Sequence, residues 1–224
     1  MEETMAESMN GTPDISVFGL FTVPESVAVT WIIMAALTVL FILAGRNLKK
    51  SPPRFQVITE LAVGGLNNFF RENLGRHWRS FAPWLGTVAI YLACANLAGM
   101  AGLDPPTRDL SVTASLALMS MLLIYGAQFR FHGFAGGLKK FAEPMAVLLP
   151  INLMEIAIRP LSLCMRLFGN ILASYVIMEM IKVVLPAVLP VPFSLYFDLF
   201  DGLIQTLVFV FLTTIFVGES IEGT

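Results

Sequence analysis

Charged residues are scarce in this chain. Only 13% of its 224 residues are Asp, Glu, Lys or Arg and 56% are hydrophobic, whereas soluble domains carry roughly 25% charged residues. This balance excludes an ordinary soluble domain. Several apolar runs reach or approach the roughly 20 residues that cross a hydrocarbon core. We therefore predict an all-α polytopic membrane protein, with residues 1–224 forming a single membrane domain.

Cysteine and histidine are also rare. Cys94 and Cys164 lie within apolar segments and are expected to pack as small side chains rather than to form a disulfide. His77 and His132 are far apart in the sequence and are expected in solvated loops, so a metal site has little support. The chain also lacks a GxxxxGK[ST] nucleotide-binding motif and has no segment for a soluble catalytic domain. We expect no metal, no cofactor, no nucleic-acid partner and no catalytic activity of its own.

Lys and Arg are absent from the first 25 residues, which predicts a retained acidic tail over residues 1–26 rather than a secretory signal. The segment 54–79 mixes apolar and charged positions at helical spacing and predicts an amphipathic helix on the membrane surface. The predicted spans are 27–44, 84–103, 112–129, 145–185 and 193–217. The fourth is longer than one straight crossing requires, so we expect it to be tilted or bent, with Pro160 as a possible bend.

Basic residues predict the orientation of these five spans. Seven Lys or Arg lie between the first and second spans and three lie between Arg130 and Lys140, whereas the tail and the turn "DPPTRDLS" together hold only Arg108. Short loops rich in Lys and Arg stay in the cytoplasm. We therefore expect the N-terminus outside and the C-terminus inside, with the last two spans forming a long tilted hairpin.

Arg166 lies deep within the fourth predicted span. An Arg near a bilayer centre costs about 2.5–3.5 kcal/mol on insertion scales, and such residues usually face protein or water along an ion path. Snorkelling to the membrane surface is the alternative. It is disfavoured because Arg166 is ten or more residues, roughly 15 Å along a helix, from either end of the apolar region.

Helical spacing divides the polar residues around Arg166 between two faces. Ser162, Arg166 and Asn170 are four residues apart and share one stripe. Tyr175 and Glu179 fall on roughly the opposite side at about 100° per residue. This helix is therefore expected to have two polar faces.

The last span carries a matching stripe of Asp198, Asp201 and Gln205 at spacings of three and four. In an antiparallel hairpin with the fourth span, Gln205 would lie opposite Arg166, with the acidic residues between Arg166 and the outer surface. This order predicts an entry path for protons or another small cation, with Arg166 blocking a direct leak. The path would run along Asp198, Asp201, Glu179 and Tyr175. The ion-binding carboxyl itself would belong to a partner.

Two further acidic residues have two readings each. Glu155 either lines an inner exit path or pairs with Arg159 at the interface. Asp109 either marks the outer entrance or caps the third span. Lys182 is expected to be an interfacial anchor.

The stretch "RPLSLCMRLFGNILASY", above all its "RLFGN", resembles subunit a of F-type ATP synthases, the stator channel beside the rotating c-ring. "PPTRDLSVTASLAL", "GFAGGLKKFAEP" and "DGLIQTLVFVFLTTIFVGES" follow the family's pattern in the family's order. The resemblance covers most of the chain from about Trp84 onward. It implies two offset aqueous half-channels for H⁺ or Na⁺, a c-ring and peripheral-stalk b subunits as partners, contact with membrane lipid, and a bacterial cytoplasmic membrane.

The resemblance also implies roles for particular residues. Arg166 would be the stator arginine that faces the c-ring carboxyls, with Asn170 and Gln205 as its polar neighbours. Asp109 falls in the outer-channel aspartate motif, and Asp198 stands where relatives carry an acid or His.

Tyr175 departs from the family pattern, because many relatives carry Glu or His nine residues after the arginine. A phenol has a pKa of about 10 and is a poor proton carrier at neutral pH. We expect Glu179 or Asp201 to take over this relay.

Two other function classes compete with the stator reading. A stand-alone secondary ion transporter would move ions without partners, but the sequence has no internal repeat of the kind common in such proteins. An intramembrane hydrolase would need carboxyls that converge from separate helices. Asp198 and Asp201 are only three residues apart on one predicted helix, which disfavours it.

Overall fold

The computed structural model describes residues 14–17, 21–46, 54–101, 105–140, 149–184 and 190–221. Five stretches are helical, long and apolar enough to cross a membrane, which confirms the predicted all-α polytopic fold class. They are Glu25–Leu43, Thr59–Met100, Leu110–Gly133, Met154–Val183 and Pro192–Ile221. Helices suit these apolar stretches because each satisfies its backbone hydrogen bonds internally.

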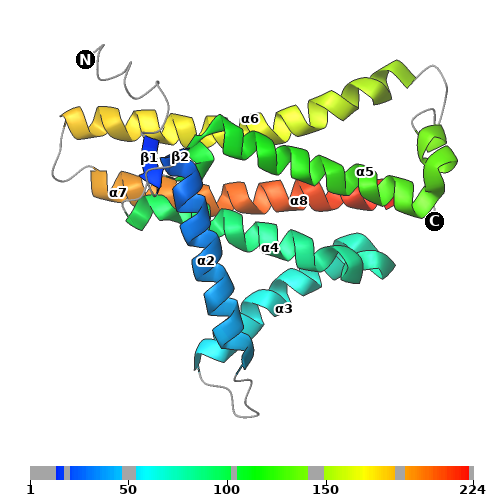
Figure 1. The fold of residues 1–224 in the computed structure, drawn as a ribbon, viewed down its shortest axis with the longest axis horizontal. Helices are drawn as coiled ribbons and strands as arrows, with labels where there is room; N and C mark the ends of the chain where they lie inside the picture. The colour runs from blue at the N-terminus through cyan, green and yellow to red at the C-terminus, as the bar shows by residue number, and fades with distance from the viewer. Residues whose placement is uncertain are drawn as a thin grey trace.

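Four helices form an elongated bundle (Figure 1). They are α4 (Trp78–Leu97), α5 (Leu110–Lys140), α6 (Leu149–Val184) and α8 (Gly202–Ile221). α5 contacts both α6 and α8, and α8 also contacts α4. α6 and α8 run in opposite directions, as the predicted hairpin requires, and their connection at 185–189 lies outside the described residues.

Two further helices form a side arm. α2 (Glu25–Arg46) crosses the bundle, and α3 (Arg54–Leu74) returns from the far end of α2 to pack on α4 and α8. At the start of α2, a short hairpin pairs β1 (Asp14–Val17) with β2 (Phe21–Pro24). The sequence did not predict this hairpin within the acidic tail.

Helix boundaries differ from the predicted segments where glycine or proline intervenes. The helix expected over 54–79 ends at Leu74, because Gly75 adopts a positive φ of 53° that starts a 3₁₀ turn. α5 is broken at Gly133, which has a φ of 69°. α6 continues through Pro160 and changes direction along its length (Figure 1), in keeping with the expected bend.

Two packed clusters hold the bundle together. One joins α3, α4, α5 and α8 around Phe70, Leu85 and Ile124. The other joins α4, α5, α6 and α8 and includes Leu163, Leu167 and Phe209. Between membrane helices such contacts stabilise by van der Waals packing rather than by transfer from water.

The expectation of a solvated loop is wrong for His132, whereas His77 lies in the 3₁₀ turn Gly75–His77 and is partly exposed. The ring of His77 packs against Phe131, with centroids 4.7 Å apart. His132 lies within α5, and its Nδ1 is buried.

Candidate ion path

Arg166 lies on α6 with its side chain exposed. Leu163 and Leu167, three residues before and one residue after Arg166, are buried in the second cluster and hold this turn of α6 against the rest of the bundle. Its exposed neighbours Met165 and Leu161 are apolar. In the part of the chain that the structure describes, no carboxylate pairs with Arg166. This guanidinium is therefore presented on an apolar surface.

Arg159, two turns earlier on α6, is engaged within the chain. Its Nη2 donates to Glu155 at 2.5 Å and to Glu219 of α8 at 3.2 Å. Its guanidinium also lies over the ring of Phe216, 4.8 Å from the centroid. Of the two readings of Glu155, the structure shows the pair with Arg159. The exit-path role of Glu155 stays a prediction.

Asp109 links two helices at the opposite end of the bundle. Its Oδ1 accepts a hydrogen bond from the backbone N–H of Ser111 at 2.8 Å, which caps α5. Its Oδ2 accepts from the hydroxyl of Ser26 at the start of α2, also at 2.8 Å. The capping reading is therefore observed, and a role in ion entry stays a prediction.

The aromatic ring of Tyr175 on α6 makes a cation–π contact with Arg108. The guanidinium of Arg108, from the 3₁₀ turn Pro106–Arg108, lies 3.6 Å from the ring centroid. This distance is well within the roughly 6 Å range of cation–π attraction. The sequence did not predict this contact, although Arg108 is the one basic residue of the turn "DPPTRDLS".

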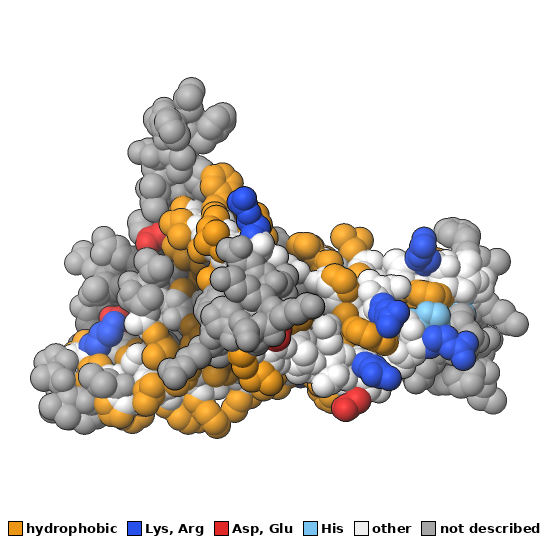
Figure 2. Space-filling model, turned by 90° about the horizontal axis from the view of Figure 1, so that it is seen from below, with side chains coloured by type: hydrophobic (Ala, Val, Ile, Leu, Met, Phe, Trp, Pro, Cys, Tyr) orange, Lys and Arg blue, Asp and Glu red, His pale blue; other side chains and the backbone are white. Residues whose placement is uncertain are grey.

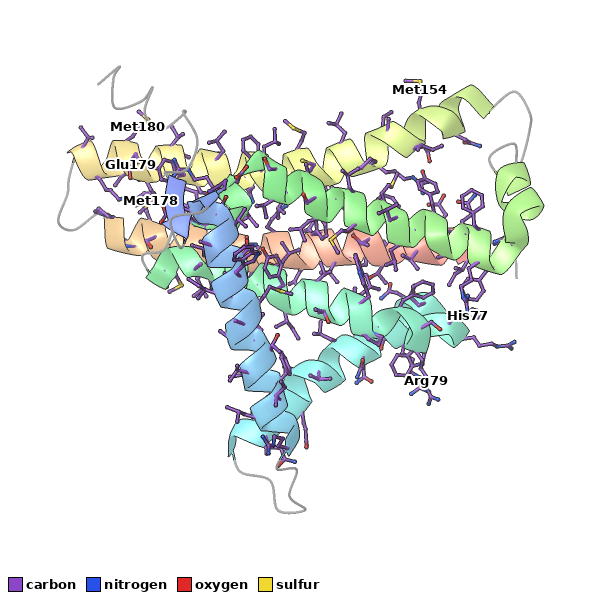
Figure 3. All side chains as sticks on the ribbon, in the orientation of Figure 1. His77, Arg79, Met154, Met178, Glu179 and Met180 are labelled. Carbon is purple, nitrogen blue, oxygen red and sulfur yellow. The ribbon has the colours of Figure 1, made fainter. Side chains whose placement is uncertain are left out.

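Glu179 lies near the C-terminal end of α6, and Met154 lies near the other end of the same helix (Figure 3). Its Oε1 accepts from Lys182 at 2.7 Å, and both side chains are about half exposed. Exposed pairs of this kind contribute about 0–1 kcal/mol. The pair is therefore a weak restraint on Glu179.

The acidic residues before α8 lie in a π-helical segment, Leu195–Asp201, which follows the short α7 (Pro190–Ser194). The single stripe predicted through Asp198, Asp201 and Gln205 assumed α-helical spacing, and this assumption is wrong up to Asp201. Hydrogen bonds in a π-helix run from i to i+5, so residues three apart no longer align as in an α-helix. Asp201 is half-buried, and the side chain of Asp198 is outside the described part.

Gln205 lies in the first turns of α8 and is only 4% exposed. Its Nε2 has no hydrogen-bond partner among the described residues. A buried amide donor without a partner is costly, so it suits a path that holds water. Asn170 of α6 is half-buried. α6 and α8 are in contact, but the direct pairing of Arg166 with Gln205 stays a prediction.

Comparison with known proteins decides the family. Residues 27–218 match the family model described as ATP synthase A chain. The chain belongs to this ATP synthase family. It is 34% identical over 221 aligned residues to "ATP synthase subunit a, sodium ion specific" of Propionigenium modestum, covering 91% of this chain and 76% of that protein. The resemblance to subunit a of F-type ATP synthases is thereby confirmed.

Membership in the ATP synthase A chain family makes this chain a membrane-integral component that assembles with the c-ring and the rest of the complex. Within the described residues, no group of three or more His, Cys, Asp or Glu is placed to hold a metal ion.

Asn96 is a buried polar residue that the sequence analysis did not single out. It is 2% exposed on α4 and hydrogen-bonds to residues of α8 and of the 3₁₀ turn Pro106–Arg108. An Asn inside an apolar span was the available signal, since polar residues there usually bond across helices.

Proposed function

We propose that this chain is the non-catalytic, ion-translocating stator subunit of a rotary ATP synthase, with two offset aqueous half-channels that lead to and from the c-ring carboxyls. The observation that carries the proposal is the contrast on α6: Arg159 is engaged by two carboxylates, whereas Arg166 is exposed and has no carboxylate partner in the described part of the chain. A partner's carboxyl would supply the missing charge.

Arg166 would separate the two half-channels electrostatically. A positive charge about 4 Å from a carboxylate is worth on the order of 4 kcal/mol at an effective dielectric near 20. A c-ring carboxyl that passes Arg166 would therefore release its proton or Na⁺. Arg suits this task better than Lys because it stays charged in a dry environment. The same charge would repel a free cation moving directly between the half-channels.

The outer half-channel would run along the π-segment. Asp198 and Asp201 lie there, Gln205 offers an unpartnered buried amide one turn later, and Asn170 lies on the facing helix. Asp109 lies at the same end and would help to form the entrance. Because Arg108 sits on Tyr175, cations would be repelled from that face of α6, which favours entry past Asp201 over entry past Tyr175.

The inner half-channel would lie beside the opposite end of α6. Glu155 and Glu219 provide two half-exposed carboxylates there, joined by Arg159. Such acidic groups would attract cations leaving the c-ring. Arg159 would keep the two helices together at this exit.

We propose a bacterial cytoplasmic membrane as the location, with the N-terminus outside. Lys and Arg side chains gather at the end of the molecule where α3 meets α4 (Figure 2), the end that carries His77 and Arg79 (Figure 3). Basic groups favour the cytoplasmic side. The largely exposed apolar surface of α2 suits contact with membrane lipid and with the b subunits.

The proposal is tested with Arg166→Ala in assembled complex within sealed vesicles. We expect loss of ATP-driven ion pumping, and undiminished coupled pumping would overturn the proposal. Both pH and Na⁺ gradients should be monitored, since the coupling ion is H⁺ or Na⁺ and the similar protein of Propionigenium modestum is sodium-specific. Ion transport by the purified chain alone would instead support the stand-alone transporter.

A further inference from the structure

Asn96 joins three elements through one buried amide. Its Nδ2 donates to the carbonyl of Gly202 at 3.0 Å and to the hydroxyl of Thr206 at 3.1 Å. Its Oδ1 accepts from the hydroxyl of Thr107 at 3.1 Å. Both amide protons are thus used, and α4 is tied to α8 and to the 3₁₀ turn Pro106–Arg108.

Gly202 is the point where the π-segment ends and α8 begins. A Cβ added to Gly202 would lie 3.0 Å from the Cβ of Asn96, so the two helices approach as closely as a glycine permits. The Gly202 carbonyl also accepts from the hydroxyl of Thr206 at 2.9 Å. The junction is therefore held by both packing and hydrogen bonds.

Thr107 connects the same amide to this 3₁₀ turn. It is fully buried and is followed directly by Arg108, which lies on Tyr175, and Asp109, which binds Ser26. One side chain, Asn96, therefore bonds to both the turn that carries Asp109 and the end of the segment that carries Asp201.

We propose that Asn96 is a positioning residue for ion entry, which keeps the segment before Gly202 in its π-helical form and holds it against this 3₁₀ turn. This inference rests on the proposed function. If the π-segment relaxed to an α-helix, the residues before the junction would rotate by up to about one residue's turn, roughly 100°. Asp201 and Asp198 would then be displaced relative to Gln205.

The test compares variants of the network in complete ATP synthase reconstituted into vesicles. ATP synthesis is driven by a fixed membrane potential while H⁺, and separately Na⁺, is titrated on the side from which ions enter. For Asn96→Ala and Thr107→Val we expect the apparent KM for the driving ion to rise at least five-fold, with the maximal rate within two-fold of wild type. Thr107→Ser keeps the hydroxyl and should restore the wild-type KM.

Thr214→Val is the matched control, because Thr214 is equally buried but its hydroxyl bonds to the Val210 carbonyl of its own helix. It should leave the KM unchanged. An unchanged KM in assembled Asn96→Ala and Thr107→Val complexes would overturn the inference, as would an equal rise in Thr214→Val. If Asn96→Ala does not assemble, the test uses Thr107→Val and Gly202→Ala. A raised apparent KM for the driving ion in these two variants supports the inference, and an unchanged KM overturns it.

Failure of this inference can be told apart from failure of the proposed function. If Arg166→Ala abolishes coupling while the Asn96 and Thr107 variants keep a normal KM, only the positioning role of Asn96 is contradicted. If Arg166→Ala pumps normally, the proposed function itself falls.

Discussion

Arg108 lies with its guanidinium 3.6 Å from the centre of the Tyr175 ring, so a cation covers the Tyr175 side chain on α6. The contact joins the 3₁₀ turn Pro106–Arg108 to α6, and the partner of the guanidinium is the aromatic ring of Tyr175. The Tyr175 hydroxyl is not needed for it.

Tyr175→Phe should therefore retain the coupled pumping rate of the wild type. Phe keeps the ring on which Arg108 lies and removes only the hydroxyl. Tyr175→Leu is the control that removes the ring, and it should lose a contact of about 0.5–2 kcal/mol and lower the yield of assembled complex. A Tyr175→Phe enzyme that assembles but no longer pumps would show that the hydroxyl relays the ion.

Asp201→Asn should reduce coupled pumping ten-fold or more, whereas Glu179→Gln should reduce it less than two-fold. Asp201 is half-buried in the π-segment on the proposed entry path, whereas Glu179 is half-exposed and paired with Lys182. The measurement is ATP-driven pumping per assembled complex. A larger effect of Glu179→Gln would move the entry path to the Tyr175 face of α6.

Arg159→Ala should weaken the link between α6 and α8. The change removes both ion pairs with Glu155 and Glu219, and these partly exposed pairs together stabilise by about 1 kcal/mol. Thermal inactivation of the purified complex measures the loss. Lys182→Ala breaks one more exposed pair on the same helix and should cost less. Equal heat resistance of Arg159→Ala and wild type would show that the pairs add nothing.

The helices could be predicted from the sequence because each apolar run is long enough to span a membrane and must satisfy its own backbone there. The boundaries were less predictable. The positive φ of Gly75 ends α3, and the presence of a glycine in the sequence does not by itself show which backbone conformation it adopts. The π-helical segment was not predicted because seven residues are too few for its i to i+5 hydrogen bonding to produce a recognisable spacing of apolar residues.

The candidate site could be predicted where a single residue violates its surroundings, as Arg166 does in an apolar helix. The contacts of Arg108 with Tyr175 and of Asn96 with Gly202 could not be. Each depends on the packing of segments 67 and 106 residues apart, which helical spacing does not reveal.

The central claim is that Arg166 prevents a direct leak between two half-channels. The most direct test is the ion flux driven by a membrane potential through complete complexes whose rotor is locked, comparing wild type with Arg166→Ala. We predict that wild type conducts no H⁺ or Na⁺ in this state and that Arg166→Ala conducts one of them. A locked Arg166→Ala complex as tight as wild type, with coupled pumping intact once unlocked, would contradict the account.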